Sequence, residues 1–324
     1  MAADSRRVAV VTDGAASLPP GVCDALGVGV VPMSVMIGNT VREDQEVAPA
    51  DVVESAGRDL VTTSAPSPGD YLRTLEELGD RPVVIATVAR RMSASYDAAM
   101  TAARYVPQRR VAVVDTETAA GGQGLVVMAA AQASRAGGSH DDVTAAARGV
   151  IRRVRLLAFL DQLDYLARSG RVPDVAARAG QSLGMRAVFE FSGGRVRGRL
   201  PARSTDAAVA RIMAACRAGR SDGARLHAAV VDAKSPHAAE SLMTAVRRLS
   251  PDGEVYAAPF SSVMVAHTGP GVAGLAWWWE PTRPAAATDP MPLAAMAVCD
   301  LRGDRDHRDV GSRAWHDFQP LVAQ

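Results

Sequence analysis

The segment Val8-Ala9-Val10-Val11-Thr12-Asp13 is a short apolar run that ends in a hydroxyl and a carboxylate. Its apolar part is too short for the core of a signal peptide, and no apolar run in the chain reaches the ~18 residues of a membrane-spanning helix. An apolar run of this length that ends at a charge predicts a buried strand. We therefore expect a cytoplasmic protein with no stable membrane insertion.

Similar runs recur along the first half of the chain, separated by segments with a helical pattern. The expected strands are Val8–Val11, Val28–Val35, Val83–Val88 and Val111–Val114, and the expected helices are Pro68–Leu78, Ser93–Tyr105 and Leu125–Ala136. This alternation predicts βαβ units, and hence an α/β fold whose mostly parallel sheet has helices on both faces. Ligands of such sheets bind beyond the carboxyl ends of the strands.

The pattern changes after Val150. Further strands are expected at Arg155–Leu160 and Ala228–Val231, helices at Pro173–Leu183, Thr205–Ala218 and His237–Leu249, and a hairpin over Val188–Leu200 with Gly193-Gly194 at its tip. These elements predict a second α+β domain, and 324 residues are enough for two domains. We assign residues 1–153 to an N-terminal α/β domain, 154–280 to a C-terminal α+β domain and 281–324 to a weakly ordered tail rich in proline and charge.

Composition and motif searches exclude several classes of function. A net charge of +1 gives no general attraction for nucleic acid, and three distant cysteines with six scattered histidines favour neither a disulfide framework nor a metal site. The chain has no GxxxxGK[ST] phosphate loop. The glycines of Gly121-Gly122-Gln123-Gly124 lack dinucleotide-binding spacing, so we interpret them as close packing of a helix on a sheet. We therefore expect no cofactor.

The segment Gly180-Gln181-Ser182-Leu183-Gly184 fits the G-x-S-x-G pattern of the hydrolase nucleophile elbow. That elbow requires a strand before the serine and a helix after it. Here a helical pattern precedes Ser182 and a strand pattern follows it, so we interpret the segment as the end of a helix. A serine hydrolase that uses Ser182 or Ser93 stays as the alternative function.

Two loops carry hydroxyl groups that suit an anion. In Thr63-Ser64-Ala65-Pro66-Ser67-Pro68, Ser67 is a helix cap, whereas Thr63 and Ser64 have no structural task that the sequence reveals. Ser93 follows a predicted strand and opens a helix, where it can cap the helix or help to bind a carboxylate or phosphate at the N-terminus. His267, before Gly269-Pro270-Gly271, lies in a tight turn and is more often structural than catalytic there. The residues alone thus indicate an α/β protein with an anion site made from hydroxyls and helix N-termini.

Taken in order, these segments resemble the DegV family of fatty-acid-binding proteins. The matching motifs are Val11-Thr12-Asp13-Gly14-Ala15-Ala16-Ser17-Leu18-Pro19, Val30-Val31-Pro32-Met33 with Arg42-Glu43-Asp44, Thr63-Ser64-Ala65-Pro66-Ser67-Pro68, Met92-Ser93-Ala94-Ser95-Tyr96, Val114-Asp115-Thr116, Leu163-Asp164-Tyr165-Leu166 with Gly170-Arg171-Val172, and His267-Thr268-Gly269-Pro270-Gly271. The similarity spans residues 7–279, and the sequential order of the motifs is more specific than any one of them.

The resemblance implies one long-chain fatty acid in a buried tunnel between two domains. It assigns the carboxylate to the hydroxyls of Thr63 and Ser93 and to the backbone N–H of Ala94, with Arg171 and His267 near the same end. It also implies a carrier without catalytic residues, which presents the carboxylate to a separate ATP-dependent fatty-acid kinase. The cluster Arg195, Arg197, Arg199 and Arg203 is then a kinase-docking face or simply a solvated hairpin; a nucleic-acid module on this cluster is a third hypothesis.

The sequence departs from the family motifs at three positions. Gly14 and Ala15 replace two hydroxyl residues, so any polar contact of those hydroxyls is missing here. Ala94 replaces a glycine, and an alanine is strained if the backbone needs positive φ. We therefore expect the geometry at the head group to differ from that in relatives.

Overall fold

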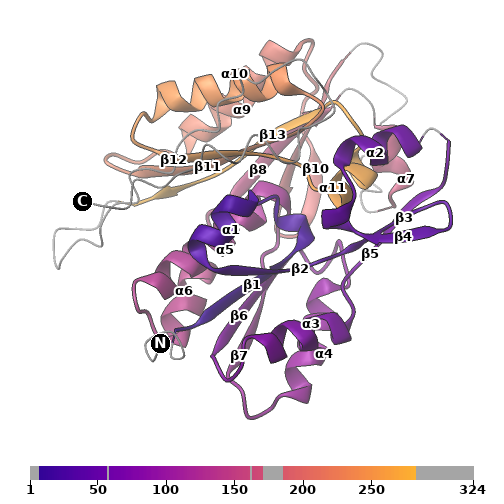
Figure 1. The fold of residues 1–324 in the computed structure, drawn as a ribbon. Helices are drawn as coiled ribbons and strands as arrows, with labels where there is room; N and C mark the ends of the chain where they lie inside the picture. The colour runs from indigo at the N-terminus through magenta and orange to yellow at the C-terminus, as the bar shows by residue number, and fades with distance from the viewer. Residues whose placement is uncertain (1–6, 57, 161–162, 171–184, 282–324) are drawn as a thin grey trace.

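The computed structural model describes residues 7–56, 58–160, 163–170 and 185–281 (Figure 1). The predicted helix Pro173–Leu183, together with Arg171 and Ser182, lies outside these ranges, and so does the predicted tail beyond Pro281. No helix in the described part of the chain is long and apolar enough to cross a membrane.

The first half of the chain forms the predicted parallel sheet, with strand order β2-β1-β6-β7. Its strands are β1 (Ala9–Asp13), β2 (Val28–Val31), β6 (Val83–Thr87) and β7 (Val111–Asp115). Every residue of β1 and β6 is buried, as expected for central strands that are covered on both faces.

Helices cover both faces of this sheet (Figure 1). They are α1 (Pro20–Leu26), α5 (Ala120–Arg135) and α6 (His140–Ile151) on one face, and α3 (Pro68–Glu77) and α4 (Ser95–Tyr105) on the other. Alternate residues of one strand serve the two cores: Val10 packs with α1, α5 and α6, whereas Val11 packs with α3 and α4. The α/β class predicted from the alternating runs is confirmed.

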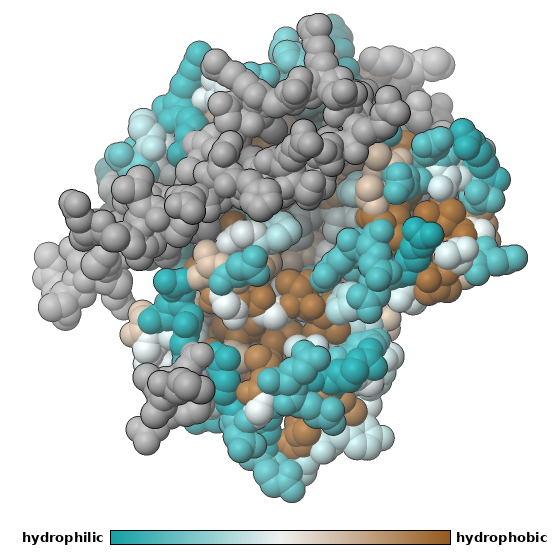
Figure 2. All heavy atoms as spheres, viewed as in Figure 1, coloured by the Kyte–Doolittle hydropathy of each residue, from teal (hydrophilic) through white to brown (hydrophobic). Residues whose placement is uncertain are grey.

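One predicted strand is wrong, because the run Val28–Val35 is divided between two sheets. After β2 the chain passes through Pro32, which has no N–H to donate to a ladder, and enters the antiparallel sheet β4-β3-β5. Its strands are β3 (Ser34–Ile37), β4 (Thr40–Glu43) and β5 (Val61–Ser64), and the short helices η1 (Gly14–Ala16), η2 (Asp44–Glu46) and α2 (Pro49–Ser55) complete this region. Figure 2 shows apolar residues around β2 and over α2 and the small sheet, with polar residues between them.

The second half forms a six-stranded sheet with order β10-β9-β8-β13-β11-β12, in which only β11 and β12 are parallel. Its strands are β8 (Arg155–Leu160), β9 (Ala187–Ser192), β10 (Arg195–Gly198), β11 (Arg225–Ala233), β12 (Glu254–Pro259) and β13 (Val272–Glu280). Its helices are α7 (Asp164–Arg168), α9 (Thr205–Ala218), α10 (Pro236–Leu249) and α11 (Ser262–Thr268). The chain enters this sheet between Ile151 and Arg155, and we propose that the domain boundary at residues 153 and 154 lies there.

Helix α5 packs between the two sheets. It contacts β1 and β6 of the first sheet and β11 and β13 of the second. A Cβ atom on Gly121 would lie 2.8 Å from the Cβ of Ala229, and one on Gly124 would lie 2.9 Å from the carbonyl oxygen of Ala16. These glycines therefore permit the close packing of helix on sheet by which we interpreted them. The helix begins at Ala120, before the predicted start at Leu125, because the glycines belong to its first turns.

We expect Gly121→Ala to destabilise the protein by roughly 1–3 kcal/mol, because the added methyl overpacks the contact with Ala229. Gly149→Ala in α6 is the matched control: nothing lies within 4 Å of its added Cβ, so the better helix propensity of alanine should raise stability by up to about 1 kcal/mol. Urea unfolding midpoints measure both changes. Equal effects of the two substitutions would contradict this account of the interface.

Candidate functional site

A mostly apolar cavity of about 860 Å³, measured out to its open mouth, lies where the two halves of the fold meet. Small-molecule sites are usually concave and mostly apolar with a few polar groups in the wall, as this cavity is. The first half supplies Ala15, Met33, Thr63, Ala65, Val88, Met92, Ser93, Ala119 and Ala120, and the second supplies Leu156, Ala158, Leu166, Ser169, Phe189, Phe191, Val196, Phe260, Val263, Met264, His267 and Thr268.

The wall from β9 follows the period-two pattern of a strand. Phe189 and Phe191 face the cavity, whereas Glu190 between them faces the other way and pairs with Arg155 at 2.6 Å and with Arg199. The predicted hairpin is confirmed: Gly193 and Gly194 both have positive φ, 57° and 69°, as a tight two-residue turn requires.

Three of the predicted ligand-binding residues line this one cavity. Thr63 comes from β5, Ser93 from the loop after β6, and His267 from the last turn of α11. The Thr63 hydroxyl and His267 Nε2 are hydrogen-bonded at 2.8 Å. If Nε2 carries the ring proton, it donates to the threonine oxygen and leaves the threonine proton free for a ligand.

Ser93 precedes the start of α4, and the interpretation of Ser93 as the N-cap of this helix is wrong. The N-cap is Ala94, whose φ of −75° places no strain on an alanine, so the departure from glycine at this position is tolerated. Ser93 Oγ accepts a hydrogen bond from the backbone N–H of Ser95 at 3.3 Å and lies 2.9 Å from the Ser95 hydroxyl. Ala94 itself is not among the residues that line the cavity.

Two buried carboxylates hold the backbone behind the cavity. Asp13 accepts N–H groups from Ala15 at 3.1 Å and Val88 at 2.9 Å, and Asp44 accepts the N–H of Met33 at 2.9 Å. Ala15, Val88 and Met33 all line the cavity, so the two aspartates fix its wall. Burial raises the pKa of both carboxyls, in the case of Asp44 to about 6, with a further contribution from the negative charge of Asp13.

A steric conflict with Asp44 explains why residue 14 is a glycine. A Cβ atom on Gly14 would lie 2.0 Å from Oδ2 of Asp44, so a side chain cannot stand there while Asp44 keeps its place. The loss of a hydroxyl contact at Gly14 stays a prediction. In this chain the Asp44 carboxylate occupies the space that a side chain would take.

The glycine turn after His267 brings two distant motifs together. Gly269 has φ of 71°, and a Cβ on it would lie 2.4 Å from the ring of Tyr165. Glycine is therefore required both by the backbone conformation and by the aromatic ring. The contact fixes the end of α11 against α7 and with it the position of His267.

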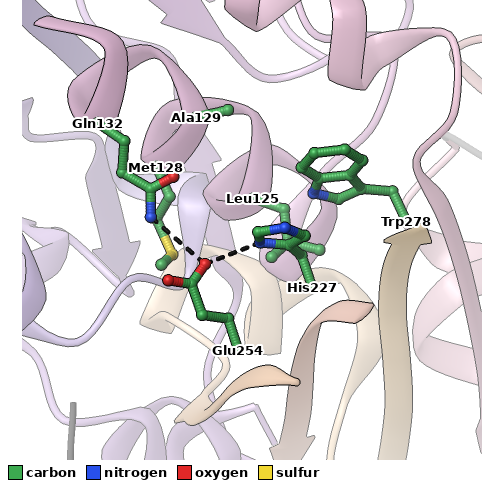
Figure 3. Close-up of a pocket in the computed structure, with 7 residues that line it drawn as sticks. All are labelled: Leu125, Met128, Ala129, Gln132, His227, Glu254 and Trp278. Atoms are coloured by element: carbon green, nitrogen blue, oxygen red, sulfur yellow. Dashed lines mark hydrogen bonds and ion pairs between the residues drawn. The ribbon is translucent and has the colours of Figure 1, made fainter. Parts of the chain in front are cut away.

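A second, smaller polar site lies at the contact between α5 and the second sheet (Figure 3). His227 on β11 is stacked on Trp278, with 4.3 Å between ring centroids, and its two ring nitrogens lie 2.8 Å from Glu254 and 3.0 Å from Glu280. Gln132 of α5 donates to Glu254 at 3.4 Å. Because ionised carboxylates only accept hydrogen bonds, the arrangement favours the imidazolium form of His227, in which both ring nitrogens donate.

The described residues give no support to the hydrolase alternative. Ser182 lies outside them, and the hydrogen bonds of Ser93 go to Ser95, while His267 pairs with Thr63. Within the same ranges, no group of three His, Cys, Asp or Glu side chains is placed to hold a metal. Sequence reasoning did not assign Ser169 or Thr268 to the ligand site, although both line the cavity. Thr268 lies within a quoted motif and Ser169 next to one, which is the signal that points to them.

The fold and cavity define a two-domain α/β protein with an apolar cavity that has hydroxyl groups in its wall. The model for the family described as "Uncharacterised protein, DegV family" matches residues 7–280. This chain therefore belongs to the DegV family.

Three relatives illustrate the similarity. A DegV domain-containing protein of Streptomyces coelicolor is 33% identical over 279 residues, which cover 84% of this chain and 98% of the relative. A fatty-acid-binding DegV family protein from Thermus thermophilus has a TM-score of 0.78 at 29% identity, with 84% of this chain and 99% of that chain covered. The Streptococcus pneumoniae fatty acid kinase B3 protein, loaded with linoleic acid, shares the fold with a TM-score of 0.73 at 19% identity, and the match covers 84% and 99% of the two chains.

The His227 site predicts a pH dependence of stability. Burial alone would lower the pKa of His227, but the hydrogen bonds to Glu254 and Glu280 outweigh it and raise that pKa above 6.5. The charged ring therefore stabilises the fold fully below about pH 6.5, and this contribution is lost as the pH rises through the raised pKa. Arg225, 3.8 Å from Glu254, is the other charged group at the site.

We expect the difference in free energy of unfolding between the natural protein and His227→Gln to be largest near pH 6 and to shrink toward about pH 9. Urea titrations across this range measure it, and Glu254 and Glu280, whose pKa values are lowered, stay ionised throughout. A difference that does not change with pH would show that the histidine is not charged in the folded protein.

Proposed function

We propose that this protein binds one long-chain fatty acid, with the acyl chain in the apolar cavity and the carboxylate at Thr63 and Ser93. The observation that carries the proposal is the joint placement of Thr63, Ser93 and His267 in the wall of a cavity that is otherwise mostly apolar. The fatty-acid-binding relative from Thermus thermophilus supports the same ligand class.

The energetics suit such a ligand. Burial of an acyl chain contributes roughly 0.8 kcal/mol per CH₂ group, and each hydrogen bond to a carboxylate contributes roughly 1.5–3 kcal/mol. The backbone at the start of α4 adds the positive end of a helix dipole next to Ser93. Arg171, which the resemblance assigns to the same end, lies outside the described residues, and its role there is part of the proposal, as is that of the Ala94 N–H.

We further propose that the protein is a carrier and not an enzyme, and that it presents the carboxylate to a separate ATP-dependent fatty-acid kinase. The fold likeness to the fatty acid kinase B3 protein supports this partner. Arg195 and Arg197 are exposed on β10, whereas Val196 between them lines the cavity, so these arginines stand on the outer side of the ligand wall. Arg199 is paired with Glu190 and is less suited to docking.

Mass spectrometry of the organic extract of the purified protein tests ligand binding. We expect a near-stoichiometric long-chain fatty acid in the natural protein and strong depletion in Thr63→Ala/Ser93→Ala, since two lost carboxylate bonds lower affinity by about 100-fold or more. Thr62→Ala/Ser64→Ala is the matched control, because these neighbours do not line the cavity. An empty extract from the natural protein, with no uptake of added fatty acid, would refute the proposal.

The kinase proposal predicts that the loaded protein, ATP and the host's fatty-acid kinase together form an acyl phosphate, which hydroxylamine traps as a hydroxamate. We expect Arg195→Glu/Arg197→Glu to slow this reaction about tenfold or more, since reversed charges oppose docking. Arg217→Glu/Arg248→Glu, on α9 and α10, is the control. Equal rates for both double variants would show that the hairpin is not part of the docking face. Absence of an ATP-dependent product with the natural protein would refute the proposed kinase partner.

A further inference from the structure

The hydroxyl of Ser93 is part of a buried network that reaches away from the cavity. Its partner, Ser95, is completely buried, as are Asp13 and Tyr71. Burial raises the pKa of the Asp13 carboxyl and of the Tyr71 hydroxyl, and the Ser95 hydroxyl lies close enough to both groups to oppose that rise. Among the described residues, however, the Tyr71 hydroxyl makes no hydrogen bond of normal geometry.

The direction of the Ser93–Ser95 hydrogen bond decides whether Ser93 can serve a ligand. Either oxygen can be the donor at their separation of 2.9 Å. If Ser93 donates to Ser95, its only proton is used and cannot reach a carboxylate in the cavity. If the Ser95 oxygen accepts a hydrogen bond from another donor, the Ser93 hydroxyl can donate its proton to the ligand. The Ser93 oxygen still accepts the backbone N–H of Ser95.

Asp13 and Tyr71 act on this choice in opposite ways. An ionised Asp13 only accepts hydrogen bonds, so it attracts the proton of Ser95 and leaves the Ser95 oxygen in need of a donor. Tyr71 has a donor without a partner beside that oxygen. Burial keeps the tyrosine protonated, because it raises its pKa well above 10.

We propose that Asp13, Ser95 and Tyr71 are positioning residues that set the direction of the Ser93 hydroxyl. When a carboxylate takes the Ser93 proton, the Tyr71 hydroxyl replaces it as donor to Ser95. This inference rests on the proposed function, since the carboxylate is that of the bound fatty acid. It assigns a task to a buried tyrosine that does not line the cavity.

Calorimetric titration of delipidated protein with palmitic acid tests the proposal in a double-mutant cycle. We expect Tyr71→Phe to weaken binding about threefold to tenfold, the usual effect of one hydrogen bond. The exposed Tyr105→Phe is the matched control and should bind like the natural protein. Ser95→Ala removes the competitor for the Ser93 proton, so it should bind at least as tightly as the natural protein, and Tyr71→Phe should have no further effect in that background.

Titration of bound palmitic acid labelled with ¹³C at the carboxyl gives a readout that a purely structural role of Tyr71 would not move. A weaker Ser93 donor stabilises the anion less, so the pKa of the bound carboxyl should rise in Tyr71→Phe by up to about one unit. The same affinity and carboxyl pKa in Tyr71→Phe and Tyr105→Phe would overturn the proposal, and so would a Tyr71→Phe effect that persists with Ser95→Ala. If the natural protein itself does not bind palmitic acid, the proposed function fails. If it binds palmitic acid but Tyr71→Phe behaves like Tyr105→Phe, only the positioning role of Tyr71 fails.

Discussion

The buried hydrogen bond between Gln123 and Asp13, at 2.8 Å, is the interaction on which the architecture of the site depends. Asp13 ends the central strand β1 and also accepts the N–H groups of Ala15 and Val88, so one carboxylate joins three segments around the cavity. Gln123 belongs to α5, whose Gly121 contacts the second sheet at Ala229. Through this helix, the position of the cavity wall in the first half of the chain is tied to the sheet that forms the opposite wall.

The chemistry of the cavity matches an amphiphile better than a fully polar or fully apolar ligand. Its walls are mostly alanine, valine, methionine and phenylalanine, and its polar groups include the hydrogen-bonded pair Thr63 and His267 and the serine at the start of α4. Neutral hydroxyls are less costly to bury without a ligand than a full charge would be. Under the proposed function, the hydroxyls of this wall hold the carboxylate by hydrogen bonds, and the unloaded site leaves no buried charge among them.

Much of the fold follows from local pattern. The strands predicted at β1, β6 and β7, the helix cap at Ser67 and the Gly193-Gly194 turn all formed as their residues predicted. The split of Val28–Val35 was missed because a single proline redirects an otherwise continuous apolar run, and pairing with β5 is a long-range contact. Motif order led to Thr63, Ser93 and His267. The roles of Gly14 and Tyr71 depend on contacts with Asp44 and Ser95 across the fold, which spacing along the chain does not reveal.

The central claim is that a fatty acid lies with its carboxylate at the hydroxyls of Thr63 and Ser93 and its chain in the cavity. A crystal structure with a terminally brominated long-chain fatty acid tests it directly, because the anomalous signal of bromine locates the end of the chain. We expect the carboxylate within hydrogen-bonding distance, about 2.5–3.0 Å, of both hydroxyl oxygens, with bromine among the apolar residues. A ligand in the reverse orientation, or one bound outside the cavity, would contradict it.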